Sequence, residues 1–224
     1  NVKETNNDGR TEKETRLRSI LGGAGKAQAI LDTIEAAYSA ASQSTEGAPG
    51  TNSWSREKLI ATLENAAKEN GVWIEDTSNL RGEDVGEGGE NKVYQNPSEP
   101  ATVIKFNRMT YSADSEAGFD ALFDGLIAQG ELFPALEYEV LGFALDVDGN
   151  VAIILRQQYV TAERYATEEE INSWFQNNQF IKERFGFWSN GKYKIHDYKP
   201  ANVMVANNGI LAFIDPIIVS RAHQ

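Results

Sequence analysis

The order of short β-type runs around a single helix is the sequence feature that most constrains this fold. Two runs, Lys92–Gln95 and Ala101–Phe106, flank a proline-containing turn. A helical pattern follows over about Ser112–Gln129, and two further runs, Tyr138–Leu145 and Val151–Gln157, flank a glycine-containing turn. Because strands joined by short turns pair antiparallel, this order predicts an antiparallel sheet with one helix against it.

Helical segments before and after this sheet in the sequence predict an α+β fold. Residues 1–80 have helical periodicity and no chemical motif, with one helix over Gly25–Ser42 and a second after the N-cap Ser55. A third helix is predicted to begin at the capping box of Thr167. We therefore expect a helical extension at 1–80, or alternatively a separate interaction module there, followed by domains at 81–160 and 161–224.

Composition excludes several kinds of site. The chain has no cysteine and two histidines, which excludes disulfides, zinc–thiolate centres and thiol nucleophiles and argues against a multi-histidine metal or haem site. No apolar run approaches the roughly 20 residues of a membrane span, and the polar start does not resemble a signal peptide. We expect a cytoplasmic protein, and the missing initiator Met allows it to be part of a longer polypeptide.

The net charge of −12 is unevenly distributed. Residues 81–160 contain 14 acidic and five basic side chains, whereas the whole chain contains 33 and 21. So much negative charge opposes general binding to nucleic acids or anionic membranes, because phosphate groups must be met by Lys and Arg. An anionic ligand bound by residues 81–160 would therefore depend on a few specific groups.

The pair Asn208-Gly209 predicts a hairpin near the C-terminal end of the sequence. With a two-residue turn at this pair, counting outward places residue 202 opposite residue 215. Asn202 and Asp215 would then face each other with side chains roughly 5 Å apart. A carbonyl oxygen and a carboxylate at that spacing suit Mg²⁺.

The loop before this hairpin can bring further groups to the same point. Asp197 precedes Asn202 by five residues in a tight proline-containing loop, and Lys199 adds a cation. His196, taken singly, is more typical of a structural histidine. The convergence of three metal- or base-competent groups favours a functional site over an ordinary turn.

A glycine-rich turn leads into the first predicted strand. At Gly86, Gly88 and Gly89 the backbone amides can approach phosphate oxygens where a Cβ would intrude. Lys105 is the single basic residue in the apolar strand Thr102–Phe106. In so acidic a region this placement indicates an inward-facing phosphate ligand, and the alternative is an edge lysine that extends to solvent.

A carboxylate that orients Lys105 is expected on the following helix. At 100° per residue, Glu116 lies nearest the apolar stripe of that helix, and Asp120 is the alternative. An acidic residue that merely favours the first helical turn is a third interpretation.

In order and spacing these motifs resemble a protein kinase-like fold over about residues 82–216. Gly86-x-Gly88 with Val93 resembles G-x-G-x-x-G-x-V, and the segment ending at Lys105 resembles V-A-I-K. Residues 197–202 resemble the D-L-K-P-x-N loop, and Asp215 stands where the D of D-F-G is expected. Among kinase-like proteins, the chain is most similar to the compact serine/threonine/tyrosine kinase domain of bacterial and phage polyvalent proteins.

The resemblance implies a reduced kinase-like fold, with a nucleotide-binding N-lobe at 81–160 and a minimal C-lobe at 161–224. It also implies transfer of the γ-phosphate of ATP, with Mg²⁺, to a hydroxyl of an unidentified acceptor. The implied roles follow the family pattern: Asp197 orients or deprotonates the hydroxyl, Lys199 steadies the phosphoryl group, Asn202 and Asp215 hold Mg²⁺, Lys105 contacts the phosphates, Glu116 pairs with Lys105, and Gln158 and Val160 bind adenine through backbone groups.

Several features depart from the family pattern. Asn91 replaces the third loop glycine, and Ile195 occupies the usual histidine position. Pro216 replaces the phenylalanine of D-F-G, which removes the usual packing switch and resembles small-molecule or lipid kinases more. Only nine residues follow Asp215, so the sequence as given has no room for an activation loop, and we expect no regulation through one. An inactive, nucleotide-binding or scaffolding pseudokinase is the alternative function, and a protein partner could complete the substrate site.

Overall fold

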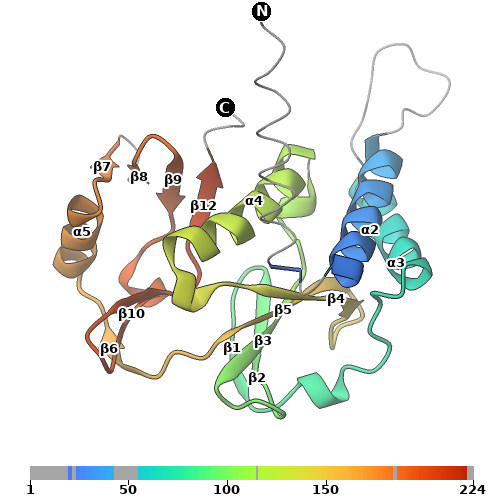
Figure 1. The fold of residues 1–224 in the computed structure, drawn as a ribbon, viewed down its shortest axis with the longest axis horizontal. Helices are drawn as coiled ribbons and strands as arrows, with labels where there is room; N and C mark the ends of the chain where they lie inside the picture. The colour runs from blue at the N-terminus through green and yellow to red at the C-terminus, as the bar shows by residue number, and fades with distance from the viewer. Residues whose placement is uncertain (1–19, 22–23, 43–54, 115, 184–185, 221–224) are drawn as a thin grey trace, which may run out of the picture. The chain divides into compact units, whose positions relative to one another are not determined.

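The structure, a computed structural model, describes residues 20–21, 24–42, 55–114, 116–183 and 186–220. The chain forms two compact units, Asn1–Asp120 with Tyr138–Gln157 and Ala121–Glu137 with Gln158–Gln224. Each unit is described here by itself (Figure 1). Within the described residues, no helix is both long and apolar enough to cross a membrane.

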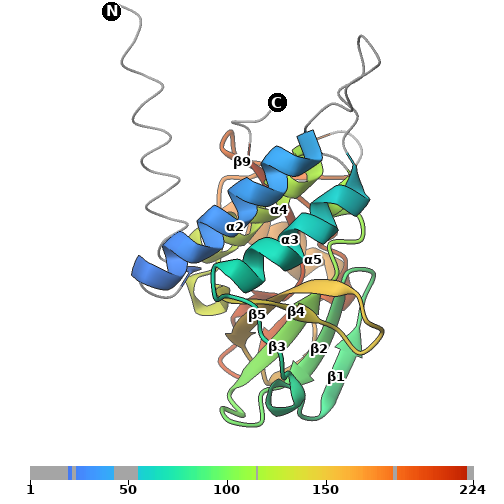
Figure 2. The same ribbon diagram turned by 90° about the vertical axis from the view of Figure 1, so that its right-hand side faces the viewer.

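Two neighbouring helices of the first unit confirm the helical prediction for its N-terminal part. Helices α2 (Ala24–Ser42) and α3 (Arg56–Glu69) pack side by side (Figure 2). The predicted N-cap is present, because the Ser55 hydroxyl accepts a hydrogen bond from the Lys58 N–H at 3.3 Å. Between the helices, the side-chain amide of Asn70 donates to the hydroxyl of the fully buried Thr33 at 3.0 Å.

The first unit also contains the predicted antiparallel sheet, with one strand more than expected. Its strands lie in the order β1-β2-β3-β5-β4. Their bounds are β1 Asp84–Glu87, β2 Asn91–Gln95, β3 Thr102–Asn107, β4 Glu139–Leu145 and β5 Val151–Gln158. Strand β3 lies in the interior of the sheet, and its residues Ile104 and Phe106 pack in the core. The extra strand, β1, contains Gly86, the first of the predicted phosphate-binding glycines.

Gly142 allows the chain after α3 to lie along the edge strand β4. A Cβ on Gly142, whose φ is +146°, would lie 2.4 Å from the carbonyl oxygen of Val72. Phe143 N–H donates to that oxygen at 3.0 Å, and Ile74 N–H donates to the carbonyl of Phe143 at 2.8 Å. The segment after α3 therefore pairs both backbone groups of Phe143 and covers this part of the sheet edge.

The single helix between β3 and β4 is present and begins slightly later than predicted. A 3₁₀ turn, η2 (Ser112–Asp114), precedes α4 (Glu116–Leu132). The first five residues of α4 belong to the first unit and the remainder to the second. In the second unit, the buried Gln129 side chain donates to the carbonyl of Phe213 at 3.1 Å.

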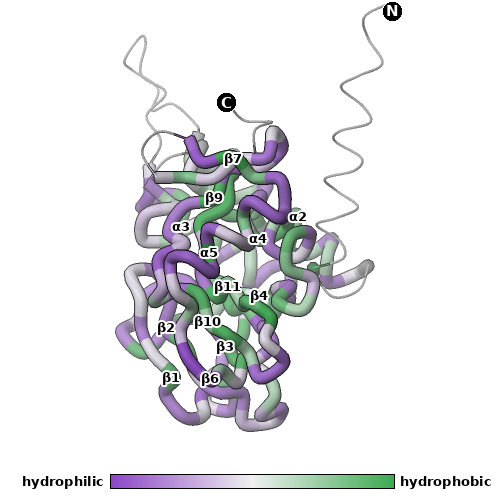
Figure 3. The backbone as a smooth tube through the Cα atoms, turned by 90° about the vertical axis from the view of Figure 1, so that its left-hand side faces the viewer, coloured by the Kyte–Doolittle hydropathy of each residue, from purple (hydrophilic) through white to green (hydrophobic). Residues whose placement is uncertain are grey.

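The second unit consists of α5 and two small sheets around an aromatic core. The sheets have the strand orders β11-β10-β6 and β12-β9-β8-β7. Their bounds are β6 Ala162–Tyr165, β7 Ile181–Lys182, β8 Trp188–Ser189, β9 Tyr193–His196, β10 Val203–Ala206, β11 Leu211–Phe213 and β12 Ile217–Ser220. Rings stack at centroid distances of 5.0 Å for Phe175 with Trp188 and 4.8 Å for Phe133 with Phe213. Figure 3 shows the hydrophobic character of β9 and β10.

Helix α5 (Glu168–Asn177) begins at the predicted capping box. Glu170 N–H donates to the Thr167 hydroxyl at 3.2 Å, and Thr167 N–H donates to the Glu170 carboxylate at 2.8 Å. The hydrogen bond from Arg164, together with that from Thr167, lowers the pKa of Glu170 to about 2. The start of α5 is therefore fixed by both backbone and side-chain contacts.

The hairpin register predicted for the C-terminal part is wrong by one residue. Val203 pairs with Phe213 and Val205 with Leu211, so the loop contains three residues rather than two. Gly209 adopts φ +77°, the left-handed residue that closes a three-residue hairpin loop. Consequently Asn202 lies opposite Ile214, whose N–H donates to the Asn202 carbonyl at 3.0 Å, and it does not pair with Asp215.

This loop predicts a specific cost for adding a side chain at Gly209. Gly209→Ala should lower the free energy of unfolding by about 1–2 kcal/mol, because an L-residue is disfavoured at positive φ. Gly25→Ala is a control, since its φ is not left-handed and its Cβ would meet nothing within 4 Å; it should be neutral or stabilising. Urea denaturation measures both, and equal effects would contradict the left-handed conformation of Gly209.

Candidate functional site

The loop between β9 and β10 brings three of the predicted site residues together. The side-chain amide of Asn202 donates to the backbone carbonyl of Asp197 at 2.7 Å and to its carboxylate Oδ2 at 2.8 Å. Lys199 Nζ lies 3.0 Å from the other carboxylate oxygen, Oδ1. Asp197 itself has φ +49°, a conformation uncommon for residues other than glycine. The backbone is therefore strained at Asp197, and Asn202 and Lys199 each contact one oxygen of its carboxylate.

A pocket of about 320 Å³ opens beside this loop. Asp197, Lys199 and their loop neighbours Tyr198 and Pro200 form one wall. The other lining residues come from α5, β7 and the turn before β8: Glu168, Ile171, Asn172, Lys182 and Gly186. The side chains of Asp197 and Lys199 are 39% and 61% exposed, so a ligand can reach both of them.

The proposed metal ligands Asn202 and Asp215 lie on two hydrogen-bonded segments, although they are not cross-strand partners. The side-chain nitrogen of Asn202 makes both hydrogen bonds to Asp197, which leaves the side-chain oxygen of Asn202 for a cation. Asp215 is half-buried and follows Ile214, the backbone partner of Asn202. Amide and carboxylate oxygens fit Mg²⁺, and the metal role of the pair stays a prediction. Within the described ranges, no three acidic or histidine side chains form a metal cluster by themselves.

In the first unit, Gly86 lies within β1, and Gly88 and Gly89, the other predicted phosphate-binding glycines, lie in the turn between β1 and β2. Gly88 N–H donates to the carbonyl of Asn91 at 2.8 Å and closes the turn. A Cβ on Gly86 or Gly88 would meet no atom within 4 Å, whereas one on Gly89 would lie 3.1 Å from the Tyr111 ring. Open space therefore borders Gly86 and Gly88, as the approach of a phosphate group to their backbone requires.

Lys105 is buried in the interior strand β3, so it is not an edge lysine. It is 5% exposed and is paired across the strands with Val93, which places the two side chains on the same face of the sheet. Lys105 Nζ lies 3.1 Å from the Tyr138 hydroxyl and 5.1 Å from the centre of its ring. Tyr138 is a contact that no sequence motif indicates, because it joins residues 33 positions apart.

The remaining predicted residues stay predictions. Glu116 is the first residue of α4, but its side chain and that of Asp120 lie outside the described side chains. Gln158 ends β5, and Val160 follows it in the second unit. The division between the units falls between residues 157 and 158, within the segment expected to bind adenine.

Comparison with known protein families identifies the chain. Residues 56–221 match the family described as the serine/threonine/tyrosine kinase found in polyvalent proteins. The chain belongs to this kinase family. The match covers more than half of the chain, including α3 and all the motifs from the glycine-rich turn to Asp215. A comparison with curated proteins gave no match.

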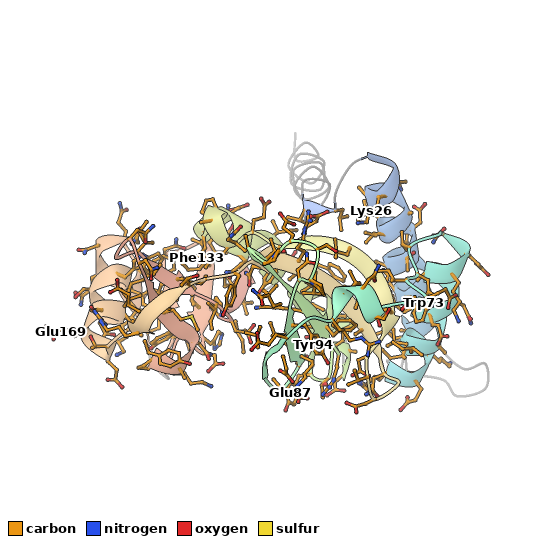
Figure 4. The ribbon with its side chains drawn as sticks, turned by 90° about the horizontal axis from the view of Figure 1, so that it is seen from below. Lys26, Trp73, Glu87, Tyr94, Phe133 and Glu169 are labelled. Atoms are coloured by element: carbon orange, nitrogen blue, oxygen red, sulfur yellow. The ribbon has the colours of Figure 1, made fainter. Side chains whose placement is uncertain are left out.

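In this kinase-family member, acidic residues beside the glycine-rich turn are held by hydrogen bonds and ion pairs. Arg108, which follows β3, donates to the carboxylates of Glu87 at 2.8 Å, Asp146 at 2.5 Å and Asp148 at 2.9 Å. Glu87 lies at the end of β1 (Figure 4). Arg108 thus ties the turn to the β4–β5 hairpin and offsets part of the local negative charge.

Glu90 fixes the other side of the same turn. Its carboxylate accepts hydrogen bonds from the backbone N–H groups of Tyr111 at 2.8 Å and Ser112 at 3.0 Å, and from the Ser112 hydroxyl at 3.0 Å. These contacts join the turn to η2, which directly precedes α4. Glu87 and Glu90 therefore act as structural anchors of this turn.

The Arg108 network predicts a loss of stability that depends on pH. Burial raises the pKa of Asp146, but hydrogen bonds from Asn150, Arg108 and Asp148 outweigh it and lower the pKa below 3.8. Arg108→Met should lower the free energy of unfolding by about 1–3 kcal/mol at pH 7, because Asp146, 1% exposed, stays buried with its charge.

Urea denaturation of the native chain and of Arg108→Met at pH 7 and at low pH tests the direction of this pH dependence. Because the pKa of Asp146 is lowered in the fold, its charged form stabilises the fold above pH 3.8, and this stabilisation is lost as the pH falls. The difference in free energy of unfolding between Arg108→Met and the native chain should therefore become smaller in acid. Arg156→Met is the control, because Arg156 is 38% exposed in its pair with Glu139 and should cost less than about 1 kcal/mol. Equal costs for the two variants would contradict the anchoring role.

Proposed function

We propose that this chain is an ATP- and Mg²⁺-dependent phosphotransferase that transfers the γ-phosphate to a hydroxyl group. The arrangement of Asp197, Asn202 and Lys199 carries the proposal, since it combines an oriented base, a cation and a metal-competent amide in one loop. Membership of the kinase family supports the same reaction. ATP as donor agrees with the cytoplasmic location expected from the sequence.

The second unit would supply the groups that act on the acceptor. The Asp197 carboxylate accepts the proton of the acceptor hydroxyl while the hydroxyl oxygen bonds to the γ-phosphorus and the bond to the bridging oxygen breaks, which releases ADP. Both carboxylate oxygens already accept one contact, and each retains a further lone pair for this proton. Lys199 stabilises negative charge on the transferring group.

The nucleotide would be held by residues of the first unit and of the chain that follows it. Backbone amides at Gly86 and Gly88 bind phosphate oxygens, and Lys105 binds the α- and β-phosphates, with Val93 beside it on the same face of the sheet. Gln158 and Val160 bind adenine through backbone groups. Mg²⁺, held by Asn202 and Asp215, would neutralise charge on the phosphates.

Two substitutions separate nucleotide binding from catalysis. With millimolar Mg-ATP the native chain should show a raised melting temperature. Asp197→Asn should retain this rise and lose roughly 10²–10⁴-fold in phosphate transfer, because it removes the base. Lys105→Met, which keeps the buried volume, should lose both, whereas Lys58→Met on the exposed surface of α3 should lose neither.

Each alternative has its own result. A native chain that binds Mg-ATP but transfers no phosphate, to itself or to added acceptors, would favour the pseudokinase that binds nucleotide as a scaffold. A native chain with no response to Mg-ATP would contradict both functions. Unchanged transfer in Asp197→Asn would show that another group is the base.

A further inference from the structure

Lys105, the proposed phosphate ligand, carries its charge on a buried side chain of the first unit. Its neighbours in β3, Ile104 and Phe106, belong to the core cluster on one face of the sheet. Side chains alternate along a strand, so Lys105 lies on the other face from Ile104 and Phe106. A buried ammonium group is costly unless hydrogen-bonding partners replace the water that it loses. The partners of Lys105 therefore decide where its charge can lie.

Tyr138 is such a partner, and it is itself 7% exposed. Lys105 Nζ donates to the Tyr138 hydroxyl at 3.1 Å. The same nitrogen lies 5.1 Å from the centre of the ring, within the roughly 6 Å of a cation–π contact. Because Nζ lies much nearer to the hydroxyl than to the ring centre, the hydrogen bond is the main contact between the two side chains.

This contact connects residues on the two sides of β5. Lys105 belongs to β3, Tyr138 directly precedes β4, and β5 lies between these two strands in the sheet (Figure 1). Neighbouring strands are about 4.8 Å apart, so two long side chains are needed to meet across a third strand. The residue after Tyr138, Glu139, pairs with Arg156 of β5. The pairing of β4 with β5 therefore fixes the place of the Tyr138 hydroxyl relative to the sheet.

We propose that Tyr138 is a positioning residue that holds the Lys105 ammonium where it binds the α- and β-phosphates of the nucleotide. An ammonium group has three donor hydrogens, so it can keep its hydrogen bond to Tyr138 while it donates to phosphate oxygens. A lysine without this partner would lose the freedom of its long side chain when the nucleotide binds, which would weaken binding. The inference rests on the proposed phosphotransferase activity and adds a residue to its nucleotide site.

Tyr138→Phe tests this role, because it removes the hydroxyl and keeps the buried ring. In the full chain, the dissociation constant of Mg-ADP should rise roughly 10-fold, since a hydrogen bond to a charged group is lost. Adenosine has no phosphate for Lys105 to bind, so its dissociation constant should be unchanged. Titrations followed by backbone amide signals in NMR spectra measure both constants, because they also detect weak binding.

ATP turnover, measured as ADP formed, gives a second readout that a purely structural role would not produce. The α- and β-phosphates are not transferred, so Lys105 binds them alike in the ground state and in the transition state. The loss in Tyr138→Phe should therefore appear in KM for ATP and leave kcat unchanged. Asp197→Asn should show the opposite pattern, with a lower kcat and an unchanged dissociation constant of Mg-ADP.

Tyr94→Phe is the matched control. Tyr94, labelled in Figure 4, is a tyrosine of β2 that is 8% exposed and belongs to the core cluster on the opposite face of the sheet from Lys105. Its ring packs edge-on against Phe106 at 5.7 Å, and this contact survives the loss of the hydroxyl. Tyr94→Phe should change neither dissociation constant. Urea denaturation of both variants checks that each keeps its fold.

Failure of this inference is distinguishable from failure of the proposed function. Equal Mg-ADP affinities of Tyr138→Phe and the native chain would overturn the inference and leave the phosphotransferase intact. A parallel loss of Mg-ADP and adenosine binding, or an equal effect of Tyr94→Phe, would also overturn it, by showing general damage to the sheet. A native chain that binds no Mg-ADP would reject the phosphotransferase together with this role of Tyr138.

Discussion

The two hydrogen bonds from Asn202 to Asp197 are the contacts on which the candidate site depends. Asp197 lies in the left-handed region of backbone space, which costs roughly 1–3 kcal/mol for such residues and persists only where surrounding contacts over-determine it. Asn202 provides this compensation by binding both the backbone carbonyl and the carboxylate. A single amide thus fixes the turn after β9 and the direction of the carboxylate, so that Asp197 lines the pocket.

Negative charge in the first unit has a structural use beside its cost to anion binding. Glu87 and Glu90 flank the glycine-rich turn, and each joins it to another segment through Arg108 or through the backbone of η2. These contacts leave Gly86 and Gly88 facing open space. The strongly acidic composition is therefore compatible with a phosphate site, since the nearest acids are engaged in fixing the turn that would bind the phosphates.

The sequence predicts local features of this fold well because their causes are local. The capping box at Thr167 and the N-cap at Ser55 follow from residues within a few positions. The hairpin at Asn208-Gly209 follows from the sequence, but its register does not, because the same pair fits a two-residue or a three-residue loop. A two-residue type I′ turn needs positive φ at both residues, whereas Gly209 has it and Asn208 does not.

In the candidate site, too, some features follow from local sequence and others only from the tertiary fold. Asp197, Lys199 and Asn202 were predicted from one short motif, and the structure joins them through side-chain contacts. Tyr138 beside Lys105 and the pocket residues Glu168 and Lys182 carry no motif. They come together only through tertiary folding, so pattern and spacing along the chain contain no signal for them.

Mapping of backbone amide signals by NMR during titration with Mg²⁺ and a non-hydrolysable ATP analogue tests the central claim most directly. The account predicts that the largest shifts occur in the glycine-rich turn 86–89, around Lys105, at 158–160, in the loop 197–202 and at Asp215, with little change in α2 and α3. Shifts confined to other segments, or no shifts at millimolar nucleotide, would contradict the assignment of these residues to nucleotide binding.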